Sequence, residues 1–167
     1  MRWLAAAGAV ALTACASHPQ FVRVGESAEA VRARLGAPYD AVKRPDGERL
    51  IYPVGAFAQQ SYLIEVGSDG LVRAVIPALT DERFAMIKMG EWDRRRVLEE
   101  FGPPAETGVV PLKKQEVWSY RYKRDGVWDS LMHVHFDMRG VVANLFHTPD
   151  PFFDSEDRNF SGLLRLP

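Results

Sequence analysis

The sequence predicts an α+β fold of two tandem repeats, each a short helical segment followed by a three- to four-stranded antiparallel meander. Two observations lead to this prediction. The same helix ending occurs twice, in the segments AVRARLGAP and RRVLEEFGPP. After each ending, stretches of alternating apolar and polar residues are separated by turn dipeptides, as in consecutive hairpins. With 167 residues, the chain is long enough for two small units.

Both predicted helices carry the start and stop signals of a short amphipathic helix. Ser27 can cap the first helix, Val31 and Leu35 lie on its inward face, and Gly36 and Pro38 end it. At a constant offset of 66 residues, the same roles fall to Asp93, Val97, Phe101, Gly102 and Pro104. Helices this short are not stable alone, so we expect each to pack on its own sheet.

Three strands are predicted after each helix. They cover residues 48–54, 60–66 and 71–76 in the first repeat, and 116–124, 129–137 and 141–146 in the second. Asp46-Gly47 marks a turn before the first of these strands, and Asp69-Gly70, Asp125-Gly126 and Arg139-Gly140 mark turns between strands. Alternation predicts one apolar face that packs on the helix and one mixed face that is open to water.

The N-terminus has the order of a secretory signal. Arg2 precedes an apolar run that is too short to span a bilayer, and the run ends in Leu12-Thr13-Ala14-Cys15. This ending resembles the lipobox of bacterial lipoproteins. The resemblance implies a lipid thioether on Cys15, cleavage after Ala14 and acylation of the new amine, for example with palmitate. Cys15 is the only cysteine, so an internal disulfide is excluded.

These signals divide the chain into five parts. Residues 1–14 form a predicted lipoprotein signal peptide, and residues 15–20 a lipidated tether. The first repeat covers residues 21–77 and the second residues 78–147. Residues 148–167, rich in Pro, Asp and Ser, form a predicted extended C-terminal tail. Ala16, directly after the cysteine, favours the outer membrane over the inner one, with the folded part facing the periplasm.

A family resemblance rests on both repeats. The segments VRVGESAEAVRARLGAP and YLIEVGSDGLV, with Tyr52 between them, resemble the repeat of the BamE (SmpA/OmlA) outer-membrane lipoproteins. The segments KMGEWDRRRVLEEFGPP, WSYRY and HVHFDMRGVV resemble it again. The resemblance implies a helix-pair-plus-three-strand domain and an accessory role in the outer-membrane protein assembly machine. Two such units in tandem also resemble the β-lactamase inhibitor protein, which binds its target through an open sheet face.

The match is structural, at Gly36, Pro38, Gly102, Pro104 and the strand aromatics. The family pattern often has Gly-Met-Thr before the helix, whereas this chain has Gly25-Glu26-Ser27, and the family's partner residues are therefore not carried over. A shared fold also does not transfer an activity.

The predicted partner-binding residues are Arg121, His133 and His135, which alternation places on the mixed face of the second meander. His133 and His135 have the spacing of two zinc ligands, with Asp137 continuing the row. A third ligand is not evident in the sequence, so no metal or cofactor is predicted. The sequence also shows no nucleophile elbow and no phosphate-binding loop, and we expect no enzyme.

The predicted function is therefore that of a non-catalytic envelope lipoprotein that acts by protein contact, as an accessory or scaffold in outer-membrane assembly or integrity. The first alternative is a periplasmic protein inhibitor of an enzyme. The second is a metal-dependent hydrolase that uses His133 and His135. A net charge of −1 gives no reason to expect nucleic acid as a partner.

Overall fold

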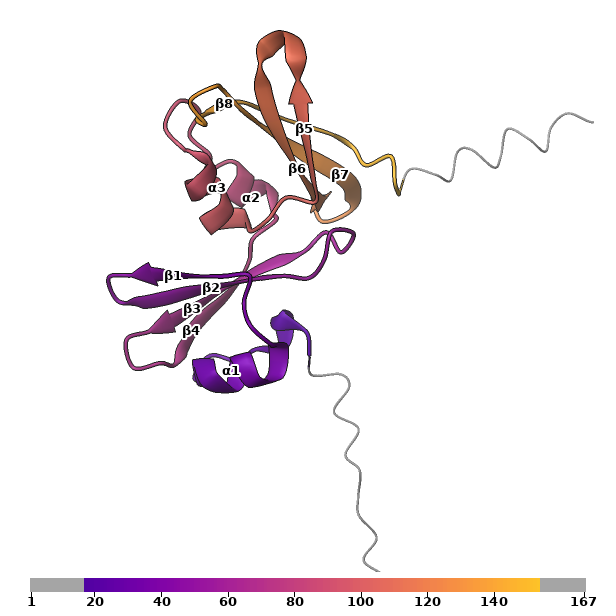
Figure 1. Cartoon of the computed structure of the whole chain (residues 1–167). Helices are drawn as coiled ribbons and strands as arrows, with labels where there is room; N and C mark the ends of the chain where they lie inside the picture. Colours follow the sequence, from indigo (N-terminus) through magenta and orange to yellow (C-terminus); the bar gives the residue numbers. More distant parts are fainter. Residues whose placement is uncertain (1–16, 154–167) are drawn as a thin grey trace, which may run out of the picture.

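Two four-stranded antiparallel sheets make up most of the structure (Figure 1). It is a computed structural model that describes residues 17–153. Sheet 1 contains β1 (Asp40–Arg44), β2 (Gly47–Pro53), β3 (Ser61–Gly67) and β4 (Val72–Pro77). Sheet 2 contains β5 (Glu106–Val110), β6 (Gln115–Arg124), β7 (Trp128–Phe136) and β8 (Val142–Pro149). The helices are α1 (Ala28–Leu35), α2 (Asp81–Phe84) and α3 (Arg94–Phe101), with 3-10 turns η1 (Pro19–Phe21) and η2 (Pro111–Lys113).

The predicted α+β class is wrong. Strands account for 45% of the residues and helices for 19%, so the fold is largely β rather than a helix-plus-strand repeat. The physical reason lies at the helix ends. Gly36 and Gly102 stop α1 and α3 after eight residues, and the chain then enters the additional edge strands β1 and β5. The helices are therefore minor elements that pack on two complete sheets.

Each sheet is an up-and-down meander in chain order. Both contain a register shift between their last two strands, at Glu65/Val66 in sheet 1 and at His135/Phe136 in sheet 2. A shift of this kind is typical of a β-bulge, which bends and twists the strand.

The two longer helices begin and end in the same way. The Ser27 hydroxyl accepts from the Ala30 amide at 3.1 Å, and the Asp93 carboxylate accepts from the Arg96 amide at 2.8 Å, as N-caps do. Gly36 and Gly102 have φ angles of 84° and 79°, a region that disfavours residues with a Cβ.

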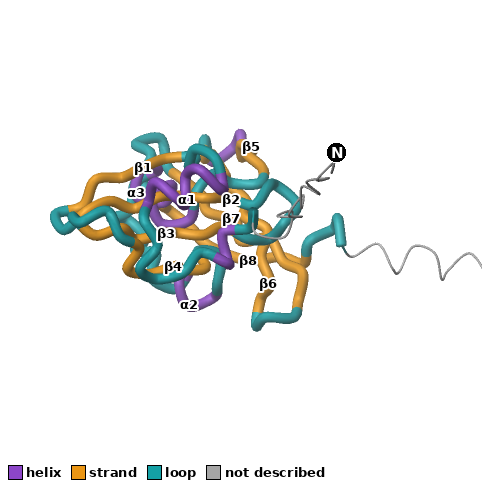
Figure 2. Tube along the Cα trace, turned by 90° about the horizontal axis from the view of Figure 1, so that it is seen from below, coloured by secondary structure: helices purple, strands orange, loops and turns teal. Residues whose placement is uncertain are grey.

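The elements stack in layers. From the bottom of Figure 1, the order is α1, sheet 1, α2 with α3, and sheet 2. In Figure 2, which looks up from below, α1 and α3 overlap the strands, as expected of stacked layers. Sheet 1 therefore lies between helices on both of its faces, whereas sheet 2 has helices on one face.

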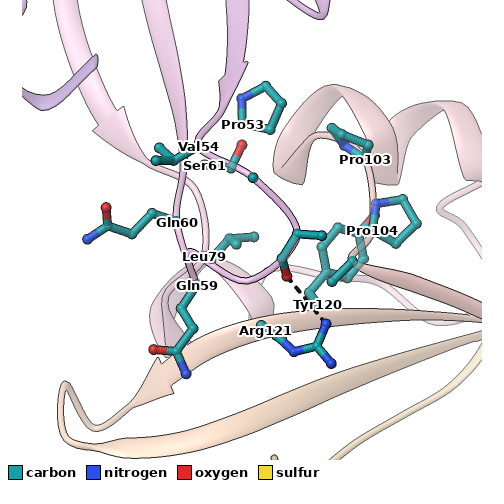
Figure 3. A pocket seen from close by; sticks show the side chains of 13 residues that line it. Pro53, Val54, Gln59, Gln60, Ser61, Leu79, Pro103, Pro104, Tyr120 and Arg121 are labelled. Carbon is teal, nitrogen blue, oxygen red and sulfur yellow. Dashed lines mark hydrogen bonds between the residues drawn. The ribbon is translucent and has the colours of Figure 1, made fainter. Parts of the chain in front are cut away.

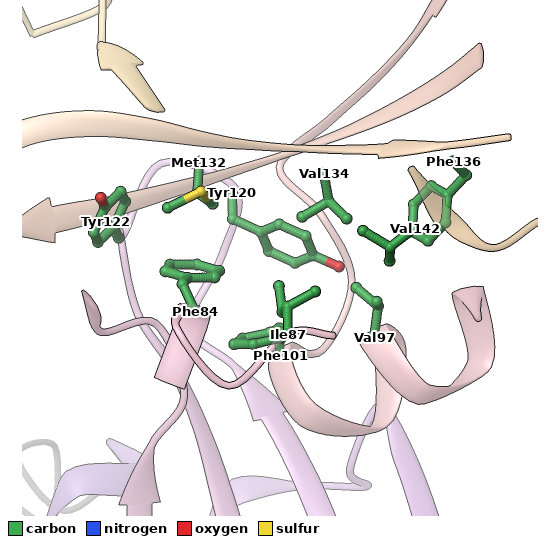
Figure 4. Packing of buried hydrophobic residues seen from close by; sticks show 10 residues of the cluster. All are labelled: Phe84, Ile87, Val97, Phe101, Tyr120, Tyr122, Met132, Val134, Phe136 and Val142. Atoms are coloured by element: carbon green, nitrogen blue, oxygen red, sulfur yellow. The ribbon is translucent and has the colours of Figure 1, made fainter. Parts of the chain in front are cut away.

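Each layer contact has its own apolar cluster. The largest cluster joins α2 and α3 to sheet 2, with the rings of Phe84 and Phe101 stacked at 4.7 Å (Figure 4). Tyr120 and Tyr122 from β6 reach into the same cluster. A second cluster joins α1 to sheet 1 and includes Val31.

The expectation that each sheet leaves one face open to water is wrong for sheet 1. Its second face buries Ile51 and Leu63 completely, together with Val42 and Ala78. The end of helix α3 lies against this face. Gly102, which directly follows α3, is so close that a Cβ added there would lie 3.2 Å from the Ile51 side chain. The second half of the chain therefore covers the second apolar face of sheet 1, which belongs to the first half.

Candidate functional site

The outer face of sheet 2 carries all three predicted partner-binding residues. Arg121 lies on β6, and His133 and His135 lie on β7. The antiparallel register pairs Arg121 with Leu131 and Ser119 with His133, which places the three side chains on the face opposite to the core. The alternation in the sequence therefore assigned the face correctly. The surroundings of the three side chains nevertheless differ strongly.

His133 and His135 are held by hydroxyl and amide partners. The His133 Nδ1 atom lies 2.9 Å from the Ser119 hydroxyl, and its Nε2 atom lies 2.9 Å from the Thr148 hydroxyl. His135 Nδ1 lies 3.2 Å from the Gln115 side-chain oxygen. Each imidazole therefore has its orientation fixed by the sheet.

Phe146 from β8 covers both imidazoles. Its ring centroid lies 5.2 Å from that of His133 and 5.1 Å from that of His135, while 44% of the residue remains exposed. Burial, with the neighbouring His135, lowers the pKa of His133, and burial with Lys113 lowers the pKa of His135. Both shifts favour the neutral imidazole, so His133, His135 and Phe146 together form an aromatic rather than a charged strip.

Arg121 is buried, although the sequence suggested an exposed contact residue. Only 6% of it is accessible. Its guanidinium forms ion pairs with Glu106 and with Asp150, the latter at 3.0 Å, and donates to the Ala56 carbonyl at 3.3 Å. The rings of Phe57 and Phe152 lie over it, with centroids at 5.1 and 5.7 Å. Arg121 therefore ties the β2–β3 loop and the segment after β8 to sheet 2.

A second ionic cluster, centred on Glu100, was not found from the sequence. Glu100 in α3 is 3% exposed and accepts from Arg49 of sheet 1 at 2.9 Å. Arg83 and Arg96 approach the same carboxylate at 2.6 and 3.0 Å. Burial alone would raise the pKa of Glu100, but Arg49, Arg96 and Arg83 outweigh burial and lower it. The sequence did contain one signal for this cluster, since Glu100 is an acidic residue beside the inward-facing Phe101 in the arginine-rich helix α3.

A cleft of about 300 Å³ lies between the two halves (Figure 3). The β2–β3 loop forms one wall, and Pro103, Pro104 and Tyr120 form the other. The Ser61 hydroxyl at its edge is buried without a hydrogen-bond partner. Such a cleft can hold an apolar group with one polar atom. Arg121 is the one charged side chain of the lining and is already paired, and the Tyr120 hydroxyl donates to the Gly102 carbonyl at 3.2 Å.

Metal binding has no geometric support in the described part of the chain. Within residues 17–153, no group of three His, Cys, Asp or Glu side chains is placed to hold an ion. Among the same residues, no helix is long and apolar enough to cross a membrane. Cys15, the predicted lipidation site, lies outside the described residues.

The four structural-motif residues are all described. Gly36 and Gly102 end α1 and α3 with their amides bonded to the carbonyls of Arg32 and Leu98. Pro38 follows α1 at the corresponding distance from the helix end, and Pro104 lines the cleft after α3. These residues shape the chain path and are not placed for chemistry.

No protein-family model and no curated protein matches the chain. Among solved structures, the chain is similar to a DUF4309 family protein (YjgB) from Bacillus subtilis. The TM-score is 0.33 at 17% sequence identity, covering 75% of this chain and 79% of that chain. A likeness this distant carries no argument about function.

Proposed function

We propose that this chain is a bacterial envelope lipoprotein, anchored by lipid on Cys15, that acts by protein contact rather than catalysis. Its role would be that of an accessory or scaffold in outer-membrane assembly or integrity, like the BamE (SmpA/OmlA) lipoproteins that its motifs resemble. The observation that carries the proposal is the segment Leu12-Thr13-Ala14-Cys15, which ends an apolar run and contains the only cysteine. The anchor would hold the folded part in the periplasm.

The surface of sheet 2 supports contact with a protein partner. Phe146 is exposed over two neutral imidazoles, and aromatic side chains on a rigid surface are typical of interface residues. Because the Arg121 guanidinium is already paired within the molecule, we assign the partner contact to the strip formed by His133, His135 and Phe146. An inhibitor of a periplasmic enzyme could use the same strip, and it remains the alternative function.

The anchor is tested by replacing Cys15→Ser and fractionating cells. We expect the wild-type protein in the outer-membrane fraction and in the detergent phase after phase separation. The Cys15→Ser variant should be absent from both the outer-membrane fraction and the detergent phase. If the variant keeps the membrane and detergent distribution of the wild type, Cys15 is not the anchor.

The contact is tested by purification from detergent-solubilised envelopes with quantitative mass spectrometry. A scaffold should recover outer-membrane assembly proteins, whereas an inhibitor should recover one soluble enzyme. Phe146→Ser should reduce recovery of the main partner, and Leu112→Ser, at a fully exposed residue in η2, is the matched control. Equal recovery with both folded variants would exclude the strip as the contact.

A further inference from the structure

Three exposed aromatic residues gather where the described chain ends. Phe57 of the β2–β3 loop packs against Phe152 in a tilted arrangement with ring centroids 4.8 Å apart, and Phe152 contacts Phe153 edge to face at 5.0 Å. Their exposed fractions are 59%, 54% and 37%. We call these three residues the aromatic cap. Single exposed apolar residues are common, but contiguous ones mark an interaction surface.

The aromatic cap is held in place from below. The Arg121 guanidinium lies under Phe57 and Phe152 and is fixed by Glu106 and by the fully buried Asp150. The exposed rings therefore sit on a buried ionic support and are ordered before any partner binds. A preordered surface loses little side-chain entropy on contact.

The aromatic cap lies at the same end of the molecule as the start of the described chain. His18 contacts Tyr62 edge to face, with centroids 5.6 Å apart, and Tyr62 is the second residue of β3, which follows the loop that carries Phe57. Tyr62 is five positions after Phe57, which limits their Cα separation to about 18 Å. Figure 1 shows the β2–β3 loop and the end of the described chain at the right side.

The start of the chain adds another exposed ring. Phe21 in η1 is 52% exposed and lies 6.1 Å from His18. Ser17, the first described residue, is only two positions after Cys15. If Cys15 carries lipid, this end of the molecule is held within a few residues of the bilayer.

We infer that the aromatic cap rests in the interfacial layer of the membrane that holds the lipid anchor. This inference rests on the proposed function. Aromatic rings favour the boundary between headgroups and acyl chains, where they bury apolar area without entering the hydrocarbon. Lys123 shares the Asp129 carboxylate with Gln59 of the β2–β3 loop, so this cation near the aromatic cap is already paired. The contact should therefore depend little on lipid charge or on salt.

The test uses the acylated full chain in vesicles of phosphatidylethanolamine and phosphatidylcholine, with or without brominated acyl chains. Trp128→Phe removes the exposed native tryptophan of the described chain, and Trp92 and Trp118, which pack against the cluster between the helices α2 and α3 and sheet 2, give a constant background. Phe57→Trp then reports on the aromatic cap, and Phe152→Trp is a second reporter. Leu112→Trp is the matched control, because Leu112 is fully exposed but lies far from the aromatic cap. Leu112 is in η2, before the start of the ten-residue strand β6, whereas Arg121, which supports the aromatic cap, is near the end of that strand.

We expect the emission of Phe57→Trp to shift to shorter wavelength on vesicles and to be quenched by the brominated lipid, at low and high salt alike. The emission of Leu112→Trp should be the same in both lipids. Equal quenching of the two reporters, or no quenching of either in protein that sediments with the vesicles, overturns the contact but leaves the anchor intact. Protein that does not sediment with the vesicles overturns both the anchor and the contact.

Discussion

At the scale of single residues, the most informative group is the buried carboxylate of Glu100. It accepts from arginines of three separate segments, β2, α2 and α3, and therefore joins sheet 1 to the helices. Removing one member of a buried ion cluster leaves the remaining charges unpaired. The resulting loss of folding stability is larger than the net stability that the intact cluster contributes.

Glu100→Gln should lower the free energy of unfolding by about 3–5 kcal/mol, because four arginines, including Arg44 at 3.8 Å, lose their shared counter-charge. Urea denaturation at pH 7 measures this. Glu91→Gln is the control, since Glu91 pairs only with Lys88, at 3.6 Å, and both side chains are 67% exposed. We expect little change in that variant. Equal effects of the two substitutions would contradict the role given to Glu100.

The same carboxylate predicts a pH dependence. The folded-state pKa of Glu100 is lowered from its ordinary value of 4.5, so its contribution to stability is complete above that value. It is lost as the pH falls below 4.5 and through the folded-state pKa. The difference in unfolding free energy between wild type and Glu100→Gln should thus be constant at higher pH and narrow in acid. A difference in unfolding free energy that widens in acid would contradict the predicted direction of this pH dependence.

The pair of Arg121 and Asp150 predicts non-additive effects. Asp150 is fully buried and depends on Arg121 for its counter-charge. Arg121→Met should therefore cost about 3–5 kcal/mol of stability. Arg121→Met with Asp150→Leu should recover much of this loss, because no buried charge is left unpaired and the other partner, Glu106, is 52% exposed to water. A double-mutant cycle from urea denaturation measures the coupling, and strict additivity would show that the two residues do not act as a pair.

At the scale of elements, the two helix ends differ in what surrounds them. Gly36 and Gly102 share a positive φ, but a Cβ at Gly36 would meet no atom within 4 Å. A Cβ at Gly102 would lie 2.9 Å from the Ser61 hydroxyl and 3.2 Å from Ile51. The second glycine is therefore needed both for its backbone angle and for the approach of α3 to sheet 1.

Gly36 combines a φ of 84° with a ψ of −172°, a region that essentially only glycine adopts, so Gly36→Ala should cost about 1–3 kcal/mol from backbone strain alone. Gly102→Ala should cost clearly more, because β2 and β3 would have to move away from the end of α3. Thermal and urea unfolding of the two variants give the comparison. Losses of the same size would mean that α3 does not need this close approach.

The strands could be predicted because their signals are local. Alternating residues and Asp-Gly turns gave β2–β4 and β6–β8 to within a few residues. The strands β1 and β5 were missed as separate elements, since they are short, and β5 is mostly exposed and contains Gly108. The class was wrong because the eight-residue helices were given the same weight as complete sheets.

The surroundings of the candidate site could not be predicted from local patterns. Alternation placed Arg121 on the outer face, but its burial depends on Phe57 and Asp150, which are distant in the sequence. The two-sided burial of β3 had a signal in its nearly continuous apolar run SYLIEV, which is typical of a strand covered on both faces. The sequence does not say which element provides the second cover.

At the scale of the whole molecule, the two halves share helix α3. Its Phe101 packs with the core of sheet 2, while its Glu100 pairs with Arg49 of sheet 1. Sheet 1 would expose Ile51 and Leu63 if α3 and the second half were removed. Such sharing predicts that the halves unfold as one cooperative unit rather than as two independent domains.

The tryptophans that follow the predicted signal peptide allow this to be tested, because Trp92, Trp118 and Trp128 all lie in the second half and Trp3 is absent from the processed chain. Leu63→Ala removes a fully buried side chain from the α3-facing side of sheet 1, and it should cost about 2–5 kcal/mol. Because the halves are coupled through α3, the urea midpoint reported by tryptophan fluorescence should fall with this substitution in the first half. Val31→Ala, in the α1 cluster on the other face, should lower the same midpoint if unfolding is fully cooperative. Independent halves would instead leave the tryptophan transition unchanged in both variants while the far-ultraviolet circular dichroism shows an earlier, separate step.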